Sequence, residues 1–181
     1  CLLAHVMAGR AVKLKGWPWR HVTLLFNTFM DFVVRRALAR VQEELGHECG
    51  IRIFVDGQPR TFFGMLYADD LALLSHSLCE LRAMLTVMDQ VCVELGLAIN
   101  AGKTEVMCVD ASGAMQAELA AHPIVLSGGP VTVCSAFKYL GSWLTESPTM
   151  DKEVAVRKGK AYAAFNSFAG LWSNPHLRLP D

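Results

Sequence analysis

Two adjacent aspartates, Asp69 and Asp70, lie between two apolar runs at residues 62–66 and 71–74. An apolar run on each side of a short polar break is typical of a tight hairpin of two half-buried strands. We therefore expect a hairpin over residues 62–75 with both carboxylates at its tip. Two ionised carboxylates held side by side against an apolar wall repel each other and lose hydration, so a divalent cation would stabilise them. Magnesium is the expected ion, and a solvated turn without a ligand is the alternative.

The composition predicts one sizeable core. The chain has 181 residues, of which 52% are hydrophobic, and its mean hydropathy is +0.30. One domain or part of a larger one is expected, and the high hydropathy favours a piece whose missing parts cover apolar surface. The start at Cys1 and the irregular ending over residues 172–181 are also interpreted as signs of a fragment. Uninterrupted apolar runs of about 18 residues do not occur, so no membrane partner is expected.

Charge and cysteine usage give weaker indications. The net charge is formally zero, which alone argues against a nucleic-acid binder. Residues 61–110 nevertheless hold two Lys/Arg against seven Asp/Glu, and more basic segments flank them. Such a pattern suits a polymerase, and equally an ordinary protein with uneven charge. The six cysteines show no paired spacing, so we expect a reducing, intracellular compartment, with nucleus and cytoplasm not distinguished.

Periodicity predicts helices and strands around the hairpin. Apolar residues recur at intervals of three to four over residues 24–45 and 77–95, which indicates two amphipathic helices. Residues 51–55 predict a strand, and after a turn at Asp56-Gly57 the next strand, from Thr61, runs into the hairpin. We expect these strands to form one small antiparallel sheet covered by the two helices.

The remaining segments are predicted from turn residues and short apolar runs. Residues 1–20 are expected to be irregular because Gly9, Gly16 and Pro18 interrupt them. For the second half we expect a strand over 104–109, a loop or short helix over 110–122, a hairpin of 124–126 with 131–133, and a final helix from Asp151.

The tetrad Tyr67-Ala68-Asp69-Asp70 between Leu-rich strands resembles the catalytic hairpin of reverse transcriptases, in the form typical of non-LTR retrotransposon and group II intron enzymes. Other segments resemble the same family in the same order, over about residues 22–170. They are Leu24-Leu25-Phe26-Asn27 (motif B), Gly96-Leu97 with Asn100 and Lys103-Thr104 (motif D), and Phe137-Lys138-Tyr139-Leu140-Gly141 (the hairpin that grips the primer end).

The resemblance implies an α+β fold. Residues 1–148 would be a partial polymerase palm, an antiparallel sheet backed by helices, and 149–181 the start of a helical thumb. The N-terminal fingers and the first palm strand would be missing. The implied activity of the parent enzyme is RNA-templated DNA synthesis from an RNA template, a DNA primer and deoxynucleoside triphosphates, with two magnesium ions.

The resemblance also implies roles for individual residues. Asp69 would be the main bridging metal ligand and Asp70 its partner. Lys103 would meet the triphosphate or protonate the pyrophosphate leaving group, although an ordinary exposed lysine is the alternative. The substrate contacts would come from Tyr67 at the primer end and from Asn100, Lys138 and Tyr139.

Two departures from the family pattern predict that this chain alone does not polymerise. The family takes a third carboxylate from a strand before motif B, whereas residues 1–30 contain no Asp or Glu. The Gln-Gly pair that leads into motif B in the family is also absent from residues 16–23. Two alternatives stay open: a non-catalytic nucleic-acid-binding or partner-binding remnant, and an unrelated α+β domain with a coincidental aspartate pair.

Overall fold

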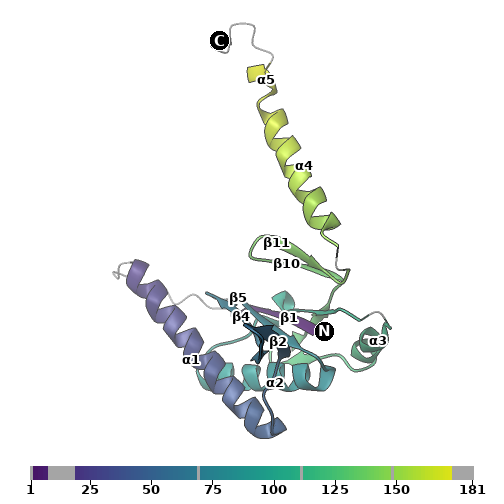
Figure 1. The fold of residues 1–181 in the computed structure, drawn as a ribbon. Helices are drawn as coiled ribbons and strands as arrows, with labels where there is room; N and C mark the ends of the chain where they lie inside the picture. The colour runs from purple at the N-terminus through teal and green to yellow at the C-terminus, as the bar shows by residue number, and fades with distance from the viewer. Residues whose placement is uncertain (1, 8–18, 69, 111, 148, 173–181) are drawn as a thin grey trace.

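The computed structural model describes residues 2–7, 19–68, 70–110, 112–147 and 149–172 (Figure 1). Its centre is a five-stranded sheet with the order β4-β5-β1-β6-β9. The strands are β1 (Leu2–Met7), β4 (Gly64–Tyr67), β5 (Asp70–Ser75), β6 (Glu105–Cys108) and β9 (Thr132–Val133). Neighbouring strands run antiparallel except β6 and β9, which are parallel. This arrangement is compatible with the expected α+β class.

Strand β1 occupies the middle of this sheet. It pairs with β5 from Leu2 opposite Ser75 to Met7 opposite Asp70, and on its other edge it pairs with β6. The expectation that residues 1–20 are irregular is therefore wrong for 2–7, because a short apolar run is also how a fully paired strand reads. The predicted absence of the first palm strand stays a prediction. Predicted irregularity over residues 8–18 lies outside the described residues.

Helices α1 (Trp19–Leu45) and α2 (Leu78–Glu94) pack together against one face of the sheet. Val33 and Val41 of α1, Leu81 and Leu85 of α2 and Leu73 of β5 are buried in one apolar cluster. Both helices confirm the periodicity, although the first begins five residues earlier than predicted. The two helices thus hold the inner side of the carboxylate hairpin by apolar burial.

The start of α2 is fixed by a buried carboxylate. Ser77 caps the helix by accepting a hydrogen bond from the backbone N–H of Glu80. The Glu80 carboxylate accepts from the Ser75 hydroxyl and from the Gly50 N–H, the latter at 2.8 Å. The Glu80 carboxylate therefore links Ser75, at the end of β5, to Gly50, which directly precedes the hairpin of residues 51–62.

The hairpin that follows Gly50 consists of β2 (Ile51–Val55) and β3 (Gln58–Phe62), joined at Asp56-Gly57 as predicted. It forms a separate two-stranded sheet, so the expectation of one sheet for these strands and the carboxylate hairpin is wrong. The chain leaves β3 at Phe62 and re-enters the main sheet at Gly64, where β4 pairs with β5. In the main sheet β4 pairs with β5, whereas β3 pairs with β2 and is not part of that sheet.

The opposite face of the sheet is covered by the hairpin of β10 (Ala136–Tyr139) and β11 (Ser142–Thr145). Phe137 and Tyr139 are buried there against Ala72 and Met107 of the sheet. From this hairpin, α4 (Asp151–Ser167) and α5 (Ala169–Trp172) extend away from the sheet (Figure 1). Helix α4 confirms the prediction of a final helix from Asp151.

Smaller elements connect these layers: the 3-10 turn η1 (Ala101–Lys103), α3 (Ala114–Ala121), β7 (Val125–Leu126) and β8 (Gly129–Pro130). The predicted hairpin of residues 124–126 with 131–133 is different in the structure. Strand β7 pairs with β8, and β9 continues to the main sheet beside β6. Among the described residues, no helix has the length and apolarity that a membrane crossing requires.

Gly64→Ala tests the close approach of β4 and β5. A Cβ at Gly64 would overlap the carbonyl oxygen of Ala72, so one backbone must move. We expect a loss of about 2 kcal/mol or more in unfolding free energy by urea titration. Gly159→Ala is the control, because a Cβ there meets open space in a helix and should stabilise by about 0.5 to 1 kcal/mol. Equal stability of Gly64→Ala and the wild type would contradict the close packing.

Candidate active site

The carboxylate hairpin has the predicted form. Strands β4 and β5 pair from Gly64 opposite Leu73 to Tyr67 opposite Asp70, so two residues of the sequence separate the last paired positions. Ala68 has a φ of +53°, as the first loop position of such turns requires. For a residue with a Cβ this conformation costs of order 1 kcal/mol or more, a strain that clusters at functional sites. The side chain of Asp69 lies outside the described residues.

Asp70 is half-buried at the start of β5, close to Tyr139. Burial raises the pKa of the Tyr139 hydroxyl, and the negative charge of Asp70 raises this pKa further. The same hydroxyl donates a hydrogen bond of 3.4 Å to the carbonyl oxygen of Met65 in β4. Tyr139 is only 7% exposed and therefore supports the carboxylate hairpin through its buried contact with β4.

The other predicted site residues lie on the surface. Tyr67 is 65% exposed beside the loop. Lys103 is exposed at the end of η1, which contacts β1 and β9, and Lys138 is exposed on β10. Asn100 is also exposed, and its backbone carbonyl accepts hydrogen bonds from Lys103 and Thr104. Of this predicted set, the structure brings Asp70 together with Tyr67, its register partner, and with Tyr139.

Comparison with known families agrees with this geometry. Residues 20–144 match the family model of reverse transcriptase (RNA-dependent DNA polymerase), which is more than half of the chain. The chain belongs to the reverse transcriptase family. Among curated proteins, none matches the chain.

The matched segment covers most of the described fold. It begins in α1, contains the carboxylate hairpin, α2, η1 and β6, and ends within β11. Strand β1 lies before the matched segment, although it pairs with β5 beside Asp70.

The described residues alone, without Asp69, do not form a two-metal centre. Reverse transcriptases generally use a divalent metal, and oxygen ligands from several carboxylates would be needed for it. The register partner of Asp70 on β1 is Met7, and β1 contains no Asp or Glu. In the part of the chain that the structure describes, which leaves out Asp69, no three His, Cys, Asp or Glu residues gather as a metal site would require.

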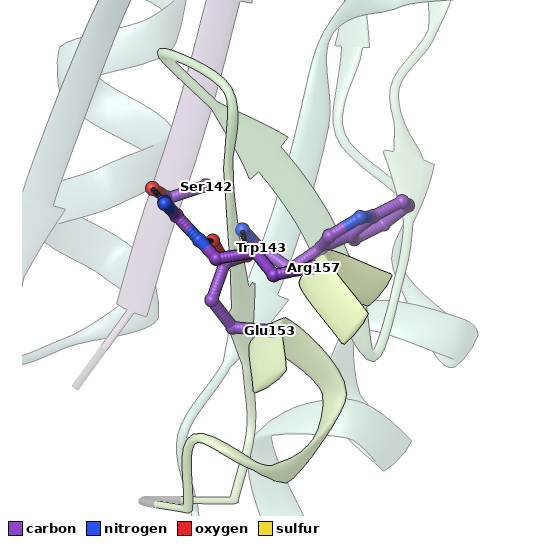
Figure 2. A network of polar contacts seen from close by, with 4 residues as sticks. All are labelled: Ser142, Trp143, Glu153 and Arg157. Carbon is purple, nitrogen blue, oxygen red and sulfur yellow. Dashed lines mark hydrogen bonds and ion pairs between the residues drawn. The ribbon is translucent and has the colours of Figure 1, made fainter. Parts of the chain in front are cut away.

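A polar network fixes α4 to the hairpin that carries Tyr139. The Glu153 carboxylate accepts a hydrogen bond of 2.7 Å from the Trp143 N–H and pairs with the Arg157 guanidinium (Figure 2). Arg157 also donates to the Ser142 hydroxyl at 3.4 Å, and the Lys152 ammonium lies 3.9 Å from the centroid of the Trp143 ring. The Trp143 N–H, and then Arg157, hold the pKa of Glu153 below its ordinary value. The first turn of α4 is therefore anchored through an ionised carboxylate.

Sequence reasoning missed β1 and the Glu153 network. The signal that could have identified β1 is the apolar run Leu2-Leu3-Ala4 followed by Val6-Met7. The Glu153 network had no signal beyond an acidic residue in the first turn of a predicted helix, since Trp143 lies on a different element. Both features depend on contacts between segments distant in sequence.

Asp70→Asn tests whether Asp70 faces Tyr139. The chain has three tyrosines, so a Tyr67→Phe, Tyr162→Phe background leaves Tyr139 as the single titrating phenol. In this background we expect Asp70→Asn to lower the pKa of Tyr139, followed by ultraviolet absorbance. Because burial remains, the value should stay above 10. Asp31→Asn on exposed α1 is the control and should leave the titration unchanged. An unshifted midpoint in Asp70→Asn would contradict the contact.

Proposed function

We propose that this chain is the central part of a non-LTR-type reverse transcriptase, whose parent enzyme copies RNA into DNA, and that the chain alone does not polymerise. The family membership and the hairpin with Tyr67 and Asp70 at its tip support the first part. The order of the segments that resemble non-LTR enzymes supports the subtype. Residues 1–148 would then be a partial palm and 149–181 the start of a thumb.

One observation carries the proposed loss of activity. Strand β1 pairs with β5 beside Asp70, and its residue opposite Asp70 is Met7, which has no carboxylate to complete a cation site. A magnesium ion would activate the primer hydroxyl and offset the negative charge of the triphosphate. With Asp69 and Asp70 as its protein carboxylates, the site lacks the ligand set for two ions.

The remaining residues can still bind and orient substrates. Tyr67 presents an exposed ring at the tip, where it can contact the sugar of a primer end. Lys103 and Lys138 present exposed ammonium groups that can meet phosphates, and Asn100 lies three residues before Lys103. Tyr139 would act through the hairpin that it supports, because its ring is buried.

A non-catalytic nucleic-acid-binding remnant is the second candidate. The observation that favours it is the exposed basic surface of α4, to which Lys152, Arg157, Lys158 and Lys160 contribute. Such a surface binds phosphate whether or not the metal site is complete. This candidate predicts salt-dependent RNA binding without turnover.

Primer extension on an RNA template with magnesium tests the proposed function. We expect no incorporation above that of an Asp69→Ala, Asp70→Ala variant, because the cation site is incomplete. An active reverse transcriptase serves as the positive control, and circular dichroism shows that both chains are folded. Incorporation by the wild-type chain that disappears in the double variant would refute the proposed inactivity and confirm the polymerase reaction.

A further inference from the structure

Helix α4 leaves the body of the protein after its first two turns (Figure 1). Glu153 is buried and Val156 is half-buried, but every side chain from Arg157 to Gly170 is exposed. Most of the stability of a helix in a protein comes from packing one of its faces, and Gly159 lowers the intrinsic helix propensity of α4 further. An exposed stretch of this length therefore indicates a surface for a partner.

The exposed part of α4 carries an apolar stripe. Val154, Ala161 and Phe168 recur at intervals of seven residues. Phe165 follows Ala161 by four residues and therefore lies on the same side of the helix. The large side chains stay about half exposed, with 52% for Val154, 59% for Phe165 and 49% for Phe168. A seven-residue apolar repeat is the seam along which two helices pack, whereas scattered exposed apolar residues need no partner.

The charges of α4 determine how a second helix can lie on this stripe. All six charged residues occupy residues 151–160, and residues 161–170 carry none. Lys158 borders the stripe, because it lies four residues after Val154 and three before Ala161. In a parallel pair of α4 helices the cationic halves would face each other. In an antiparallel pair each cationic half faces the neutral half of the other helix, toward the C-terminal end, where the helix dipole favours cations.

The stripe is self-complementary when two copies of α4 run antiparallel. A two-fold axis at Ala161 sets Val154 of each copy opposite Phe168 of the other, and the small Ala161 side chains let the helix axes approach closely. The same axis brings Lys158 of each copy beside the Phe165 ring of the other, and an ammonium group is attracted to the face of an aromatic ring. One surface thus supplies both sides of the interface, as a closed two-fold dimer requires.

We propose that two copies of this chain form a dimer through antiparallel α4 helices centred on Ala161. The Glu153 carboxylate fixes the first turn of α4 on β11, so the stripe is presented in one orientation and the entropic cost of association is lowered. A single helix pair is a small interface, and we expect a Kd of about 10 to 100 µM. The dimer does not depend on the polymerase assignment, because none of its residues belongs to β4 or β5.

Sedimentation velocity over about 5 to 500 µM protein tests the dimer. We expect the wild-type chain to change from monomer to dimer across this range. Ala161→Lys sets two ammonium groups against each other at the two-fold axis and should weaken association at least about tenfold. Ala163→Lys is the matched control, because Ala163 is exposed on the opposite side of α4, and it should change the Kd less than about twofold. Circular dichroism should show equal helicity in all three chains, since both substitutions are at exposed helix positions.

Disulfide cross-linking tests the antiparallel orientation. The background is Cys1→Ser, Cys79→Ser, which removes the N-terminal thiol and the exposed Cys79 thiol. We expect Val154→Cys chains mixed with Phe168→Cys chains to cross-link with each other under mild oxidation. Val154→Cys chains alone should stay uncross-linked, because the two copies of residue 154 lie at opposite ends of the helix pair.

Three results would overturn the proposed dimer. The first is a wild-type chain that stays monomeric at about 500 µM. The second is equal affinity of Ala161→Lys and Ala163→Lys, whether high or low, which would assign the association to another surface, such as the exposed Leu25 and Phe32 of α1. The third is cross-linking of Val154→Cys chains with themselves and not with Phe168→Cys chains, which would show a parallel pair.

Discussion

The pairing of β1 with strands on both of its edges is the interaction on which the rest of the structure depends. β5 carries Asp70, β6 follows the turn that carries Lys103, and the two strands are joined through β1 alone in the described sheet. Without β1, the hydrogen-bonding edges of β5 and β6 would need water or another strand. The same strand that holds the sheet together also brings no acidic residue to the neighbourhood of Asp70.

The two faces of the sheet do different work. Helices α1 and α2 bury the inner face and give the hairpin its rigid base. On the other face, Tyr139 links β10 to β4 under the hairpin tip, and Glu153 links β11 to the first turn of α4. A continuous series of polar contacts and buried rings therefore connects the carboxylate hairpin with the basic helix α4.

Local patterns predicted the parts of this fold that local contacts determine. The carboxylate hairpin, α2 and the β2–β3 turn at Asp56-Gly57 are confirmed, because their periodicity and turn residues are sufficient. The pairing of β1 with residues 63 to 73 positions later, and the pairing of β9 with β6, depend on distant partners that no local pattern encodes. The burial of Tyr139 could not be predicted for the same reason, because its neighbours are distant in sequence. The roles of Asp69 and Lys103 stay predictions.

Manganese binding by a Met7→Asp variant, followed by electron paramagnetic resonance, tests most directly whether β1 lacks the carboxylate that a cation site beside Asp70 needs. Asp at the register partner of Asp70 adds a carboxylate from the neighbouring strand, and we expect at least about tenfold tighter binding than in the wild type. Leu2→Asp, opposite Ser75 at the far end of the strand, adds the same charge and should give no such gain. Equal affinity of the wild type and a folded Met7→Asp variant would contradict the account.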